Sequence, residues 1–289
     1  MNKQIFRAPD DLRLGAIALR VRDLEPMCDF YSNFLGLDLL HQEADRVDLG
    51  FEPEQPLVSL SARPNGSQRP GNMSGLYHFA LLVSRRDRLA HALKQLLHSG
   101  YPLQGFADHF VSEAIYLTDP EGNGIEIYAD RPRATWRWDG DQLRIGTAPL
   151  DIDALIGLAQ EGDDQPILSE GAVLGHMHLQ VSSLPEAMRF YESLLGFDSM
   201  GKYGDSAAFY AAGGYHHHIG LNTWASADGP NASSQMLGLD HFEIIYRETL
   251  QLEAFVEALV SSGLPYDRND QGVWLEDPSS NRIKIRAER

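Results

Sequence analysis

The sequence predicts an α+β fold of four strand–helix–strand–strand–strand (βαβββ) modules, arranged in two homologous halves. The first observation behind this prediction is an internal repeat. Residues 14–21, LGAIALRV, return as LGHMHLQV at residues 174–181, and the segment FYSNFLGLDLL from Phe30 returns as FYESLLGFDSM from Phe190. Similarity between two such stretches at one fixed offset indicates two copies of a single structural unit. The second observation is that each half repeats the same order of elements once more within itself.

A second strand opens inside each half, as GLYHFALLV from Gly75 and as GLDHFEIIY from Gly238. Each is followed by a helical pattern that ends at a glycine, RDRLAHALKQLLHSG in the first half and LEAFVEALVSSG in the second. Each half then closes with a turn and a strand, LTDPEGNGIEIY from Leu117 and LEDPSSNRIKIR from Leu275. The four predicted modules span residues 12–62, 76–130, 174–224 and 239–287.

These modules define the predicted domains. Residues 1–135 form an N-terminal domain with modules one and two, and residues 174–289 form a C-terminal domain with modules three and four. Residues 136–173 are predicted to be a linker. Within it, DIDALIGLAQEGDDQPILSEG reads as a short helix followed by an acidic loop.

Composition restricts the class of ligand. The chain has 289 residues, 43% of them hydrophobic, and a formal net charge of -17, which disfavours nucleic acid and anionic membranes because both bind basic patches. Cys28 is the only cysteine, so neither an intrachain disulfide nor a cysteine metal cage is expected. No stretch approaches the ~18 apolar residues of a membrane span, and no apolar signal segment is found at the N-terminus. We therefore expect a cytoplasmic protein that binds a small molecule.

The pattern L-G-H-x-x-L-x-V, then FYxxxLGF, then DPxGNxIEIY resembles the vicinal oxygen chelate superfamily, which includes glyoxalase I, bleomycin-resistance proteins and type I extradiol dioxygenases. The likeness extends over nearly the whole chain. It implies that the modules form curved-sheet cups, as in the glyoxalase and extradiol dioxygenase fold. Four modules in one polypeptide resemble the extradiol dioxygenases more than the shorter members, and most of all the bacterial catechol ring-cleaving enzymes.

The family holds its metal with residues that begin the first strand and lie midway along the last strand of a module. Module one has Ala16 and Ser59 at these places, and neither is a useful ligand. Module four has His241 and Lys284, and a protonated lysine repels a divalent cation, so this pair is degenerate. The remaining modules offer three ligands, His78 and Glu126 from module two and His176 from module three.

His78, Glu126 and His176 make a two-histidine, one-carboxylate set, which suits non-haem Fe(II) and leaves positions open for a diol and O2. Mn(II) suits the same ligands. Modules two and three are therefore expected to face each other around the metal. The resemblance also places a catalytic tyrosine ten residues before the ligand glutamate, and Tyr116 stands there, whereas the matching residue in module four is Trp274.

Three consecutive histidines occur in the last strand of module three, GGYHHHIGLNTW. The extradiol dioxygenases carry HH-x-x-[AG] in this strand, and aligning it on His217 and His218 makes His218 the acid–base residue. An imidazole with a pKa near ~6.5 can take up and return a proton at neutral pH. His217 is then a substrate-binding candidate, as is His109 in ADHFVSEAIY, while His178 is expected to be a core histidine.

The function that the resemblance implies is extradiol ring cleavage, in which O2 is inserted beside the two hydroxyls of a catechol-type diol. One alternative is a metal-dependent isomerase or lyase like glyoxalase I, although such sites generally use two carboxylates. A second alternative is a metal-free binding protein of the resistance type. The sequence leaves open the ring substituents of the substrate, the oligomeric state, and whether modules two and three of one chain or of two chains form the site.

Overall fold

The computed structural model describes residues 6–160 and 165–288. Module one consists of β1 (Arg13–Val21), α1 (Leu24–Asp29), the π-helical turn η1 (Phe30–Phe34), β2 (Asp38–Gln42), β3 (Arg46–Glu52) and β4 (Gln55–Ala62). Module two consists of β5 (Gly75–Leu82), α2 (Arg86–Ser99), β6 (Leu103–Asp108), β7 (Ser112–Thr118) and β8 (Gly124–Asp130). Both follow the predicted βαβββ order.

The second half repeats this order. Module three consists of β11 (Val173–Gln180), α4 (Leu184–Arg189), the π-helical turn η3 (Phe190–Leu194), β12 (Asp198–Tyr203), β13 (Ala207–Ala211) and β14 (Ile219–Asn222). Module four consists of β15 (Gly238–Tyr246), α5 (Thr249–Ser262), β16 (Asp267–Asn269), β17 (Gly272–Glu276) and β18 (Arg282–Ala287). The predicted fold of four βαβββ modules is confirmed.

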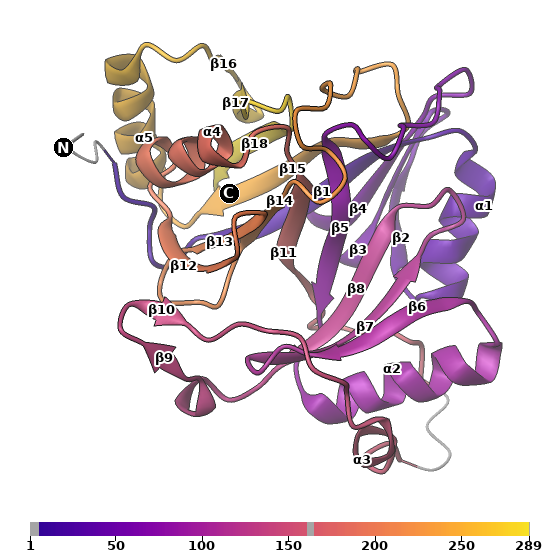
Figure 1. Cartoon of the computed structure of the whole chain (residues 1–289). Helices are drawn as coiled ribbons and strands as arrows, with labels where there is room; N and C mark the ends of the chain where they lie inside the picture. The colour runs from indigo at the N-terminus through magenta and orange to yellow at the C-terminus, as the bar shows by residue number, and fades with distance from the viewer. Residues whose placement is uncertain (1–5, 161–164, 289) are drawn as a thin grey trace.

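The modules combine into two eight-stranded sheets, each of which takes one module from either half. One sheet has the order β12-β13-β14-β11-β5-β8-β7-β6, and the other has the order β16-β17-β18-β15-β1-β4-β3-β2. Figure 1 shows β5 and β11 side by side in the middle of the first sheet. Modules two and three therefore share a sheet, and modules one and four share the other.

The segment between the halves carries a short 3-10 turn η2 (Arg133–Thr135), the small hairpin of β9 (Trp138–Asp139) and β10 (Gln142–Leu143), and the helix α3 (Ile152–Ile156). The expected short helix is α3, while the acidic residues 161–164 that follow lie outside the described residues. Trp136 and Leu143 pack on Met200 and Tyr215 of module three. The domain boundaries at residues 135 and 173 stay a prediction.

The repeated FY and DP motifs meet inside each half. The hydroxyl of Tyr31 donates a hydrogen bond to the buried carboxylate of Asp119 at 2.8 Å, and Tyr191 donates to Asp277 at 3.1 Å. Each aspartate also accepts bonds from the backbone and side chain of the asparagine four residues later in its turn. A buried carboxylate needs such donors because it has lost its contact with water. The motifs that carry the resemblance thus join the modules of one half.

In the described part of the chain, no helix has both the length and the apolar character that crossing a membrane requires.

Candidate metal and substrate site

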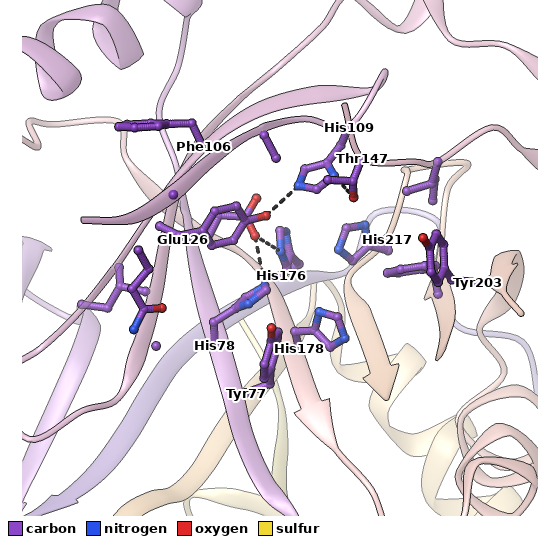
Figure 2. A pocket seen from close by; sticks show the side chains of 18 of the residues that line it. Tyr77, His78, Phe106, His109, Glu126, Thr147, His176, His178, Tyr203 and His217 are labelled. Carbon is purple, nitrogen blue, oxygen red and sulfur yellow. Dashed lines mark hydrogen bonds and ion pairs between the residues drawn. The ribbon is translucent and has the colours of Figure 1, made fainter. Parts of the chain in front are cut away.

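A cavity of about 540 Å³ opens on the first sheet, and modules two and three supply most of its walls. The linker closes one side with residues 145–147. Its floor includes His78, Glu126, His176, His178 and His217 (Figure 2). This volume lies in the range of about 300–1,000 Å³ that is typical of small-molecule sites.

Strand register explains why the three candidate ligands meet. His176 on β11 pairs with Ala80 on β5, and Ala80 pairs with Glu126 on β8. His78 lies two residues before Ala80 and so projects from the same face of β5. The small side chain of Ala80 leaves space between the larger residues around it. The structure brings His78, Glu126 and His176 together, all three buried.

The separations of these ligand atoms fit a metal ion. Oε2 of Glu126 lies 3.0 Å from Nε2 of His78 and 3.1 Å from Nε2 of His176. Ligands about 2.1 Å from a metal and at right angles to each other are about 3 Å apart. Nε2 of His78 is buried and, despite its distance from Glu126, makes no aligned hydrogen bond within the described residues. His176 makes a hydrogen bond to Glu126, and the ligand atoms of all three residues lie close enough together to share one cation.

The charge states of the ligands agree with metal binding. Burial lowers the pKa of His176 to about 4, against the opposing attraction of Glu126, so this imidazole is neutral at pH 7 and keeps a lone pair for a metal. Burial alone would raise the pKa of Glu126, but His176 and His78 hold it well below its usual range. The donor set is therefore a carboxylate and two imidazoles, the combination that suits Fe(II) and Mn(II).

The equivalent region of the other sheet is filled by an ion network. Lys284 lies opposite Trp274 and Glu243 in the strand register, as Glu126 lies opposite Tyr116 and Ala80. Nζ of Lys284 is 2.8 Å from Glu243, and Arg286 approaches the same carboxylate at 3.1 Å. His241 packs on Trp274 and contacts Asp240. Within the described residues, His78, Glu126 and His176 are the one group with metal-site geometry.

Tyr116 and His109 act as a pair at the cavity wall. Nδ1 of His109 lies 2.7 Å from the carbonyl oxygen of Gly146 and must donate to it, so Nε2 accepts the bond from the Tyr116 hydroxyl at 2.6 Å. Burial raises the pKa of Tyr116 well above its usual value, which keeps the hydroxyl protonated. Because its proton is directed at His109, the Tyr116 oxygen can accept a hydrogen bond from a ligand. The two candidates from the sequence are thus brought together.

The three consecutive histidines precede β14 in irregular backbone, so their predicted place inside the strand was wrong, and they have different surroundings. His217 lines the cavity, and its ring centroid lies 4.1 Å from that of His176. His216 is fully buried behind it. His218 is not among the residues that line the cavity, and it packs beside Tyr215 while its Nδ1 accepts the backbone N–H of Ala212. Burial lowers the pKa of His218 to about 3, so it is neutral at pH 7.

The position of Gly220 explains why His217, and not His218, lines the cavity. The motif HH-x-x-[AG] requires a small residue in its fifth place, and Gly220 fills that place when the motif begins at His216. His217 then has the second place, which the alignment on His217 and His218 had given to His218. The acid–base role of His218 stays a prediction, and its position outside the cavity does not favour it.

His178 is a cavity residue that the sequence interpretation assigned to the core. It lies opposite His78 in the strand register and lines the cavity beside Tyr77 and Trp224. Its Nε2 is buried and has no hydrogen-bond partner within the described residues. Its spacing of two from His176 was the available signal, because residues two apart on a strand share a face.

Known proteins resemble this chain over most of its length. The model of the Glyoxalase/Bleomycin resistance protein/Dioxygenase superfamily matches residues 13–127 and 173–285. Catechol-2,3-dioxygenase of Bacillus subtilis (strain 168) is 39% identical over 276 residues, which cover 94% of this chain and 95% of that protein. Biphenyl-2,3-diol 1,2-dioxygenase 3 of Rhodococcus globerulus is 27% identical over 120 residues, which cover 41% of this chain and 63% of that protein.

Among solved structures, glyoxalase I from Zea mays has a TM-score of 0.56 and 17% identity, and the match covers 95% of this chain and 92% of that one. At this identity the likeness is one of fold.

Proposed function

The chain belongs to the Glyoxalase/Bleomycin resistance protein/Dioxygenase superfamily and is one of its dioxygenases, and from this premise we propose that it is an Fe(II)-dependent extradiol dioxygenase of a catechol-type diol. The observation that carries the proposal is the buried set of His78, Glu126 and His176 at the floor of the cavity. These residues would hold the metal from three sides. Bound there, Fe(II) would supply adjacent positions for the diol oxygens and O2 and would pass electron density between them.

His217 is the residue best placed to manage protons. A catechol that binds as its monoanion gives up one proton as it enters the cavity, and a later step needs a proton back. His217 lines the cavity beside His176, whereas His218 faces Tyr215. We assign the acid–base role to His217 for this geometric reason. Tyr116, whose proton is directed at His109, accepts a hydrogen bond from the substrate at the opposite wall.

The remaining walls would orient the ring. Tyr77, Phe209 and Trp224 give the cavity an aromatic side next to His178, and aromatic side chains pack well against a planar substrate. The ring would therefore lie with its diol edge toward His78, Glu126 and His176. Opening the ring beside the hydroxyls would give a product of the muconic semialdehyde type.

The two rival functions are weaker on this geometry. A glyoxalase-like isomerase or lyase generally uses two carboxylates, and the ligand group of the described residues contains one, Glu126. A metal-free binding protein would not need a buried carboxylate with two imidazoles directed at it. The cytoplasmic location stays a prediction.

Metal content and O2 uptake with catechol test the proposal, on protein prepared anaerobically with Fe(II). The wild type should bind one metal ion per chain and consume O2, and Glu126→Ala should lose both. Lys284→Ala, the matched change in the other sheet, should keep both because Arg286 still pairs with Glu243. Tight metal binding without O2 uptake on any diol would favour the isomerase or lyase, and a metal-free wild type would favour the binding protein.

A further inference from the structure

A line of hydrogen bonds leads from the protein surface to the cavity through three side chains. Oδ1 of Asp130, at the end of β8, lies 2.9 Å from Nε2 of His216. Nδ1 of His216 lies 2.7 Å from Nδ1 of His217. The Asp130 side chain is 28% exposed, whereas that of His216 is fully buried and His217 lines the cavity.

The chemistry of these groups fixes the direction of the bonds. An ionised carboxylate can only accept, and the same Oδ1 also receives the Tyr215 hydroxyl at 3.3 Å. Nε2 of His216 must therefore carry the proton that it shares with Asp130. In a neutral imidazole the other nitrogen is then an acceptor, so Nδ1 of His216 accepts from Nδ1–H of His217.

These bond directions determine the state of Nε2 of His217. With its proton on Nδ1, His217 keeps a lone pair on Nε2, and the side-chain hydrogen bond that His217 makes among the described residues runs from Nδ1 to His216, while the residue itself lines the cavity. We propose that Asp130 and His216 are positioning residues that hold His217 in the Nδ1–H tautomer, with Nε2 as the proton acceptor toward the cavity. The tautomer is a property of the protein alone, and its use in catalysis rests on the proposed function.

A carboxylate that accepts a hydrogen bond from an imidazole selects the tautomer of that imidazole, and here Asp130 acts on His217 through His216. An imidazole in the other tautomer would present a donor to the cavity and could not take a proton from a ligand. The fully buried ring of His216 packs among Tyr128, Trp136 and Tyr215, which hold it in place between its two partners. Packing thus fixes the ring planes and Asp130 fixes the proton.

Long-range ¹H–¹⁵N NMR of the metal-free protein with ¹⁵N-labelled histidine tests the tautomer directly. The signals of His216 and His217 are assigned by their loss in His216→Gln and His217→Gln. We expect protonated Nδ1 and bare Nε2 in His217, with the reverse in His216. Protonated Nε2 in His217, or two protonated nitrogens in His216, would overturn the proposal.

Variants separate orientation from packing. Asp130→Ala removes the acceptor and should give a mixture of His217 tautomers. Tyr215→Phe removes the second donor to Oδ1 and the hydroxyl that pairs with Tyr128, but it keeps the carboxylate and the ring beside His216, so it should leave the tautomer unchanged. In the iron-loaded enzyme, Asp130→Ala should lower kcat by about 10- to 100-fold with little change in KM. An unchanged tautomer in Asp130→Ala would count against the proposal.

The two proposals fail separately. Wild-type protein with the expected tautomer but no ring cleavage would overturn the proposed function and leave the assignment of Asp130 and His216 standing. Ring cleavage with the opposite tautomer would overturn this assignment and leave the dioxygenase standing.

Discussion

Gly220 gives the ring of His178 its space beside the ligands. A Cβ at position 220 would lie 3.0 Å from Cγ and 3.2 Å from Cδ2 of His178, closer than side chains normally pack. The two residues are register partners on β14 and β11, so the contact follows directly from strand pairing. A glycine in a strand interior often marks such a close approach.

Gly220→Ala should therefore displace the His178 ring within the cavity. Moving a ring off its preferred rotamer costs about 0.5–1.5 kcal/mol, so KM for catechol should rise about 2- to 10-fold. Steady-state kinetics measure this change. Gly71→Ala is the matched control because a Cβ there meets nothing within 4 Å. Equal KM values for Gly220→Ala and the wild type would mean that His178 does not contact the substrate.

At this scale the sequence predicted some residues and missed others for a clear reason. His78, Glu126 and His176 could be found because the repeats align module on module. The separate places of His216, His217 and His218 could not, because an extra histidine leaves the motif register ambiguous by one residue. The three residues also lie in irregular backbone before β14, where no strand alternation determines the direction of each side chain.

The FY segments connect the two modules of each half through a buried hydrogen bond. In both halves a short α-helix continues into a π-helical turn, η1 or η3, and this turn holds the tyrosine that reaches the aspartate of the DP turn. The apolar pattern predicted a helix here but not its π character, and the partner of Tyr31 in this turn, Asp119, lies far along the sequence.

Tyr31→Phe and Tyr191→Phe should each lower the free energy of unfolding by about 1.5–3 kcal/mol. Each removes one hydrogen bond from a buried carboxylate and leaves the oxygen less well satisfied. Urea denaturation measures the effect, and Tyr203→Phe on the exposed end of β12 serves as the control. A loss of metal with unchanged stability would show that these tyrosines serve the site instead.

At the scale of the whole molecule, the two sheets have the same strand topology but carry different side chains at equivalent positions. The sheet of modules two and three encloses a cavity with ligands, while the sheet of modules one and four encloses Glu243 between Lys284 and Arg286. The repeat predicted four modules and the ligand pattern predicted which two form the site. The ion network was not predictable, because Glu243 occupies the position of Ala80 and only the strand register shows that it meets Lys284.

Glu243→Gln should destabilise the protein by about 3 kcal/mol at pH 7, because it leaves two cations close together without their shared carboxylate. Its metal content should equal that of the wild type. Burial alone would raise the pKa of Glu243, but Lys284 and Arg286 hold it below its usual value. The unfolded chain therefore takes up the proton at higher pH than the folded protein does.

The pH dependence of stability follows from the lowered pKa of Glu243 in the folded protein. The stability that Glu243 contributes is fully present above the unfolded pKa of about 4.3 and is lost as the pH falls toward the lower folded pKa. The difference in unfolding free energy between the wild type and Glu243→Gln should stay constant from about pH 8 to pH 5.5 and shrink below about pH 4.5. A difference that grew on acidification would contradict the ion network.

The pairing of β5 with β11 and of β1 with β15 also bears on how the protein is made. Residues 1–135 emerge from the ribosome before β11 and β15 have been synthesised. The nascent first half therefore has unpaired edges on the strands β1 and β5. Open edges of this kind invite pairing with other chains. The metal ligands His78 and Glu126 come from the first half and His176 comes from the second. An isolated first half would therefore lack both the partner strands of its sheets and the third ligand of its site.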